Sequence, residues 1–178
     1  MNSRQEKIQL LSRVNRGRAA TPQFLASLSE TLGEPIDVSA LVSLQESDAL
    51  LEAFRDGYRR VVEADVMGYR KFFRKPEARL VFQLADCLAD RMLSEHGFLL
   101  TKLDTNCGAV ILDVRILLRH TGSLIRFDGD SLSAMSADQT QGLLIDHNPD
   151  DSEQTYEVAV WGDRWSLLAL ACDSKEQA

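Results

Sequence analysis

The stretch from Phe98 to Cys172 is a succession of short apolar runs separated by turn residues, and it constrains the fold most strongly. Asp-Gly and Asn/Gly-containing links between short apolar runs are typical of β-hairpins. Parallel strands would need crossovers of a dozen or more residues, which these links cannot supply. The sequence therefore predicts an antiparallel meander of six or seven strands, at 98–104, 110–119, 124–127, 132–135, 142–146, 156–161 and 165–170.

Two parts of this sheet carry most of the prediction. From Val110 to Arg119 apolar residues alternate with polar ones, which predicts a half-buried strand. The turn Gly162-Asp163 lies between the last two predicted strands, although the run from Trp165 to Cys172 is compatible with either a strand or a final helix.

The first 97 residues instead show helical spacing of apolar residues. We expect helices over 3–17 and from Thr21-Pro22 to Gly33, a short turn over 38–44, a long helix from Ser47 to just before Pro76, and a last helix over 77–96. One sheet face needs a cover, which these helices would supply. The prediction is one α+β domain over 1–178, with helices in 1–97, the sheet in 98–172 and a short polar tail over 173–178.

Composition excludes several classes of protein. With 44% hydrophobic and 26% charged residues, the chain has the composition of a soluble globular protein. It has no visible signal peptide and no apolar run near the roughly 20 residues that span a bilayer. Three scattered cysteines, none in a C-x-x-C pair, favour a reducing, cytoplasmic location. No catalytic, metal or phosphate-binding signature stands out, so we expect no enzyme activity, no metal and no cofactor.

The charge is distributed unevenly along the chain. Residues 1–97 carry 14 acidic and 14 basic side chains, whereas residues 98–178 carry 13 acidic and 6 basic ones. Between Asp128 and Asp163 there are nine acidic residues and no lysine or arginine. Because surfaces usually mix both signs, this bias indicates a surface that attracts a basic partner. The residues predicted to bind it are Asp128, Asp130, Asp146, Asp150, Asp151, Glu153, Trp161 and Asp163.

Trp161 and Trp165 bracket the predicted turn at Gly162-Asp163. Tryptophan is common at binding hot spots because it joins a large apolar surface to one hydrogen-bond donor. The alternative, equally weighted, is that at least one of the two closes the core beneath the helices.

Other patterns are better explained by ordinary structure. Asp146, Asn148, Asp150 and Glu157 match some positions of a calcium loop, but Asp151 replaces its glycine, so a solvated hairpin loop is preferred. Cys107 and His120 could form a nucleophile pair only within hydrogen-bond reach, and a turn cysteine without a role is the simpler interpretation. The basic residues over 55–79 are interleaved with acids, and the isoelectric point is near 5.0, so nucleic-acid binding is not expected. A solvated helix face, or an internal partner for the acidic sheet, explains these cations better.

These observations favour a non-catalytic protein-binding domain, most concretely an acidic inhibitor or immunity-type protein that neutralises a basic, nucleic-acid-directed toxin. A small enzyme or ligand-binding domain with a pocket between helices and sheet is an alternative, because Asp65 occupies an otherwise apolar helical stripe. A further alternative is an acidic secretion chaperone or adaptor, which would be dimeric.

Overall fold

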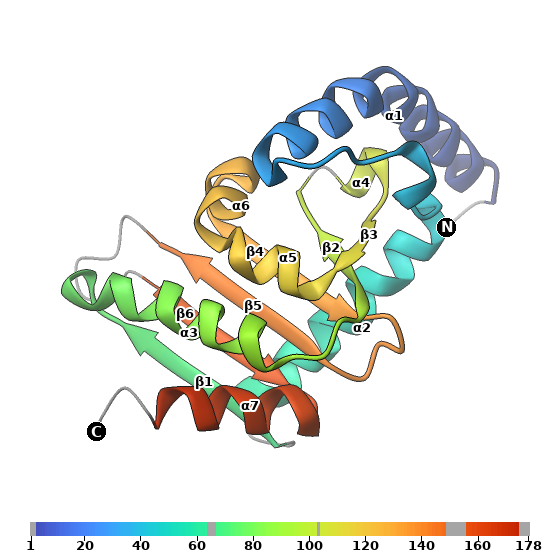
Figure 1. Ribbon diagram of the computed structural model, residues 1–178. Helices are drawn as coiled ribbons and strands as arrows, with labels where there is room; N and C mark the ends of the chain where they lie inside the picture. Colours follow the sequence, from blue (N-terminus) through green and yellow to red (C-terminus); the bar gives the residue numbers. More distant parts are fainter. Residues whose placement is uncertain (1–2, 64–66, 103, 149–155, 175–178) are drawn as a thin grey trace.

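Six strands form one antiparallel sheet with helices on both of its faces (Figure 1). The computed structural model describes residues 3–63, 67–102, 104–148 and 156–174. The strand order is β1-β6-β5-β4-β2-β3. The strands are β1 (Gly68–Phe73), β2 (His96–Leu100), β3 (Val110–Asp113), β4 (Ser131–Ser136), β5 (Gly142–His147) and β6 (Tyr156–Trp161). The predicted α+β class and the antiparallel sheet are confirmed.

The helices divide unequally between the two faces. The main core joins one sheet face to α3 (Ala78–Arg91), α5 (Val114–Arg119), α6 (Thr121–Asp128) and α7 (Asp163–Asp173). On the opposite face α2 (Leu44–Val62) packs alone, over a smaller core that includes Phe54 and Trp161. The remaining helices are α1 (Ser3–Leu32), α4 (Asp104–Cys107) and the 3-10 turns η1 (Val38–Ala40) and η2 (Lys75–Glu77). One face of the sheet is therefore covered more fully than the other.

The predicted strand over 110–119 is wrong in its second half. β3 ends at Asp113, whose side chain accepts a hydrogen bond from the Arg115 N–H and caps α5. Val114, Leu117 and Leu118 are buried at helical spacing. Val114, Ile116 and Leu118 also lie at alternate positions, so the segment fits both periods, and the capping aspartate distinguishes them.

Two further segments of the predicted meander are helical. Residues 124–127 belong to α6, and the predicted turn at 105–108 is largely α4. Gly129, with φ of 104°, ends α6 directly before β4, so the Asp-Gly pair is a helix end rather than a hairpin turn. The strands at 132–135, 142–146 and 156–161 are confirmed, within a residue or so at their ends.

The N-terminal half departs from its predicted helices in two places. α1 is continuous through Pro22, because Gly17, Phe24 and Leu28 bury one uninterrupted face on both sides of the exposed proline. This packing offsets the cost of about 3 kcal/mol for proline within a helix. α2 begins after a capping box of Ser43 and Glu46 and ends at Val62, after which the predicted long helix is replaced by β1.

The last two apolar segments also differ from expectation. α3 ends at Arg91, and β2 begins at His96, so the predicted helix over 77–96 is too long. The segment left open between strand and helix is the helix α7, with Trp165, Ala169 and Cys172 buried on one face.

Cys87 on α3 and Cys172 on α7 form a disulfide, with their Cα atoms 5.9 Å apart. Cys107 is free and buried. The inference that the cysteines are unpaired is therefore wrong, because a separation of 85 positions in the sequence hides their proximity. Because disulfides are typical of oxidising compartments, the cysteines no longer support a cytoplasmic location. The cytoplasmic location therefore stays a prediction. Among the described residues, no helix is long and apolar enough to cross a membrane.

Breaking the disulfide should weaken the attachment of α7. For the C87S/C172S double variant we expect the free energy of unfolding to be about 2–4 kcal/mol lower, because the disulfide no longer restricts the unfolded chain to a long closed loop. Urea denaturation with and without a dithiol reductant measures this: reductant should destabilise the wild type and leave the double variant unchanged. Three titratable thiols in the unreduced, denatured wild type would contradict the pairing.

Asp113 links β3 to α5 and makes stability depend on pH. Burial alone would raise the pKa of Asp113, but hydrogen bonds from Arg115 and Ser94 outweigh it and lower the pKa from 3.8 to about 2. Since the folded-state pKa is lowered, its contribution is present above pH 3.8 and disappears as the pH falls toward 2.

For Asp113→Ala we expect a loss of about 1 kcal/mol near neutral pH, the usual cost of losing a helix cap. The difference from the wild type should shrink between pH 4 and pH 2, as followed by chemical denaturation at each pH. A constant difference across that range would show that the carboxylate charge contributes nothing.

Candidate functional site

The position of α2 on its sheet face depends on Trp161. The indole lies between Gly57 of α2 and Gly142 of β5, and a Cβ at either glycine would collide with it. Phe54 meets the same ring edge-on, with the ring centroids 4.8 Å apart. α2 therefore crosses the sheet at close range and leaves part of this face uncovered on each side.

On one side of α2 the uncovered surface is acidic. Ser131, Asp146, Glu157 and Phe72 are in register across β4, β5, β6 and β1. Asp146 lies two residues beyond Leu144, which packs in the α2-side core, so strand alternation places it on the same face. Asp128 and Asp130 lie just before β4. We call Asp128, Asp130, Asp146 and Glu157 the acidic end of the sheet.

Cations from outside the acidic run neutralise part of this charge. Lys102 Nζ lies 2.5 Å from Asp130 Oδ2, and the Lys102 backbone N–H donates to Asp128 Oδ1 at 2.7 Å. Arg70 Nε lies 2.6 Å from Glu157 Oε1, which also accepts a 3.0 Å hydrogen bond from the Tyr58 hydroxyl. The nine-to-zero bias in sequence is therefore not a single-sign field in three dimensions. The prediction of an internal partner for the acidic sheet is confirmed for Arg70.

Asp146 is the exception within the acidic end. It is half-buried, and its carboxylate makes no hydrogen bond or ion pair with any of the residues that the structure describes. Burial raises the pKa of Asp146, and the negative charges of Asp130 and Glu157 raise it further. Burial also raises the pKa of Asp128, against the opposing hydrogen bond from Lys102. Asp146 is thus a strained charge that a cation from outside the protein could relieve.

The other residues predicted to bind a partner lie elsewhere. Trp161 and Asp163 lie at the opposite end of β6, where they help to line a cavity of about 240 Å³ on the other side of α2. Asp150, Asp151 and Glu153 lie outside the described residues, as does Asp65. The structure thus brings Asp128, Asp130 and Asp146 together and separates them from Trp161 and Asp163.

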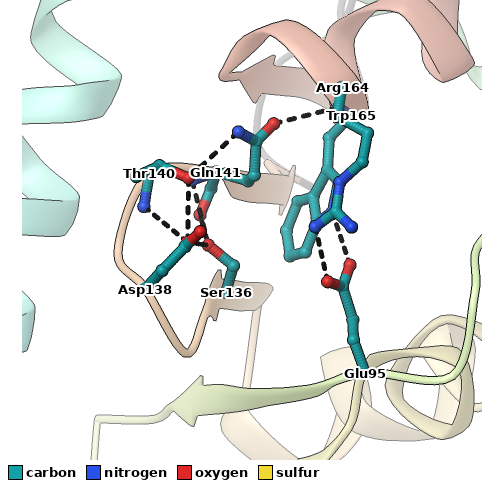
Figure 2. Close-up of polar contacts among 7 residues, drawn as sticks. All are labelled: Glu95, Ser136, Asp138, Thr140, Gln141, Arg164 and Trp165. Carbon is teal, nitrogen blue, oxygen red and sulfur yellow. Dashed lines mark hydrogen bonds and ion pairs between the residues drawn. The ribbon is translucent and has the colours of Figure 1, made fainter.

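Both tryptophans are core residues. Trp161 is 5% exposed and Trp165 is fully buried, which favours the interpretation that they close the core over that of an exposed aromatic pair. Glu95 accepts hydrogen bonds from Trp165 Nε1, at 2.8 Å, and from Arg164 (Figure 2). Gln141 Oε1 accepts the Trp165 N–H at 3.0 Å and supplies the cap that α7 lacks locally.

The β4–β5 turn beside this network is held by its own hydrogen bonds. Asp138 accepts from the hydroxyls of Ser136 and Thr140, at 2.6 and 2.8 Å, and from the Thr140 N–H (Figure 2). Asp138 therefore stabilises the turn and belongs to a different region from the acidic end.

The nucleophile pattern acquires an ordinary explanation, whereas Asp150 and Asp151 of the calcium pattern lie outside the described residues. Cys107 lies in α4, and burial raises the pKa of its thiol, partly opposed by a hydrogen bond with Thr21, so the thiol stays protonated. Asp146 and Glu157 face each other across β5 and β6, but Glu157 is engaged by Arg70 and Tyr58. In the described part of the chain, no cluster of three or more metal-ligating side chains occurs.

Sequence reasoning missed Lys102 and Tyr58 as neighbours of the acidic end, and it did not single out Arg70 among the basic residues of 55–79. Arg70 was assigned to a helix, and no local signal connects Lys102 to Asp130, 28 residues further along the chain. Strand β1, with Arg70 alternating against buried Tyr69 and Phe73, is the one pattern that could have revealed Arg70.

Comparison with known proteins adds no relative. No family model, no curated protein and no solved structure matches this chain.

If Asp146 is a strained charge, removing the charge should stabilise the protein. Its raised folded-state pKa means that the ionised carboxylate lowers stability above that pKa and costs nothing once protonated. We therefore expect Asp146→Asn to raise the melting temperature at pH 7 and to have no effect near pH 3. Asp130→Asn is the matched control and should destabilise, because it removes the ion pair between Asp130 and Lys102. A lower melting temperature for Asp146→Asn at pH 7 would contradict the assignment.

Proposed function

We propose that this protein is a non-catalytic protein-binding domain that engages a basic partner through the acidic end of its sheet. The observation that carries the proposal is Asp146, a half-buried carboxylate that is flanked by two other acids and makes no hydrogen bond or ion pair with the described residues, although the charge of Lys102 partly offsets theirs. Functional sites often keep a charge that destabilises the folded protein, because binding of a partner stabilises that charge. The net charge of −7 would speed the approach of a basic protein.

The contact would work by supplying the missing cation. A lysine or arginine from the partner would pair with Asp146 between Asp130 and Glu157. Phe72 is 40% exposed in the same row, and the Arg70 guanidinium lies 4.7 Å from its ring centroid. An apolar ring beside carboxylates suits an arginine, whose planar head stacks while its donors bind the carboxylate. Complementary charge of this kind chiefly raises the association rate and selects the partner.

The most concrete form of the proposal is an inhibitor or immunity-type protein for a basic, nucleic-acid-directed toxin, acting in the cytoplasm. A toxin that binds phosphates presents clustered lysines and arginines, which an acidic surface can cover. An inhibitor of this kind acts by covering the toxin, so it needs no catalytic residues of its own. A secretion chaperone would also be acidic, but it would be dimeric and would hold a partly unfolded partner.

Affinity capture from the source cells, at low and moderate salt, tests the proposal when the wild type is compared with two variants. Asp146→Asn removes the proposed contact. Asp163→Asn is the control, because it removes a charge that is more exposed than Asp146 and lies at the other end of the sheet. We expect a stoichiometric basic protein that the wild type and Asp163→Asn retain and that Asp146→Asn and added salt release.

With that partner purified, stopped-flow association should be slower for Asp146→Asn and less dependent on salt. A partner that binds all three proteins equally would remove the acidic end from the interface. If the partner is a nuclease, loss of its activity on adding the wild type would support the inhibitor form.

A further inference from the structure

Beside the acidic end, α2 and the sheet line an open cavity of about 300 Å³. One wall is α2, which contributes Leu51 and Arg55. The other wall consists of the end of β2, the end of α6 and the start of β4. This volume lies at the lower limit of small-molecule sites, which suits a compact ligand.

Hydroxyl groups in this cavity have unused hydrogen-bonding capacity. Thr101 lines it and is 7% exposed, and its buried hydroxyl has no hydrogen-bond partner among the described residues. Ser133, on β4, also makes no side-chain hydrogen bond in that part of the chain, whereas Ser131 donates weakly to Asp128 at 3.4 Å. Buried hydroxyls are normally satisfied, because leaving one unpaired costs about 1–3 kcal/mol. A polar molecule in the cavity would supply partners to the hydroxyls of Ser131 and Ser133, whereas the Thr101 hydroxyl is too buried for it to reach.

Three charged side chains line the cavity: Arg55 on α2, and Lys102 and Asp128 on the other wall. The Arg55 guanidinium, on α2, forms no ion pair with any described residue. Asp128 lies across from it at the C-terminal end of α6, where the helix dipole adds to the preference for a positive group. Lys102 is paired with Asp130 and so contributes no net charge here. A ligand with a single charge would satisfy one wall and oppose the other.

Part of the cavity lining is apolar. Leu51 on α2 and Leu100 at the end of β2 form this part, and Leu100 is buried in the α2-side core. A ligand therefore needs an anionic head, a cationic head and a small apolar part between or beside them.

We infer that this cavity binds a small zwitterion of the α-amino-acid type, with its carboxylate on Arg55 and its ammonium on Asp128 and the neighbouring hydroxyls. Arginine binds a carboxylate through two parallel hydrogen bonds, which fixes the orientation of the ligand. Asp128 belongs both to this cavity and to the acidic end, but the inference uses neither Asp146 nor a protein partner, so it stands or fails separately from the proposed function.

Titration of the isotope-labelled protein with each of the twenty common amino acids, followed by NMR, tests the inference. At millimolar concentration, at least one should produce saturable shifts in the amides of Thr101, Ser131 and Ser133. Arg55→Gln should weaken this binding about tenfold or more, as expected for the loss of a charged hydrogen-bonding group. Arg55→Lys should restore part of it.

Two controls make the result specific. Arg59→Gln, four residues along α2 and paired with Asp56, should bind like the wild type. The N-acetyl and amide derivatives of the bound amino acid each lack one charge and should both bind more weakly. The inference is overturned if no amino acid shifts these amides, if Arg55→Gln binds unchanged, or if either derivative binds as well as its parent.

Discussion

The contact between Trp161 and two glycines controls how this protein presents its less covered face. Because Gly57 and Gly142 lack side chains, the indole fills the space between α2 and the sheet. A single helix held at this distance cannot cover a six-stranded sheet, so open surface and cavities remain on both sides of it. The features with functional interest follow from that one placement, while the opposite face, under four helices, supplies most of the core.

The acidic end illustrates how folding changes the meaning of a charge pattern. Lys102 and Arg70 come from outside the acidic run and neutralise Asp130 and Glu157. This leaves Asp146 as a localised cost rather than one charge among many. A localised, partly desolvated carboxylate discriminates between partners better than a diffuse acidic surface, because it stabilises a bound cation at one position only. The cavity beside it is lined by charges of both signs, Arg55, Lys102 and Asp128, and by hydroxyl groups.

Several elements were predictable because their signals are local. The strands at 132–135, 142–146 and 156–161 are bounded by turns and contain apolar runs too short for helices. The helices at 114–119 and 165–170 were not predictable, because over so few positions their apolar residues fit a strand period of two and a helical period of 3.6 equally well. β1 was hidden within an apparent helix that continued α2. For the site, clustering of Asp128, Asp130 and Asp146 agrees with their proximity in sequence, whereas Trp161 and Asp163 proved to be at the far end of β6.

The sequence by itself determined the class of fold, the antiparallel pairing of its later strands and the excess of acid after residue 98, since these depend on composition and local periodicity. Only the tertiary structure decided that Cys87 meets Cys172, that Lys102 and Arg70 pair with the acidic end, and that both tryptophans are buried. The physical reason is that these contacts join residues distant in the chain. Their proximity depends on how helices pack over a sheet, a choice made by the burial of apolar surface as a whole.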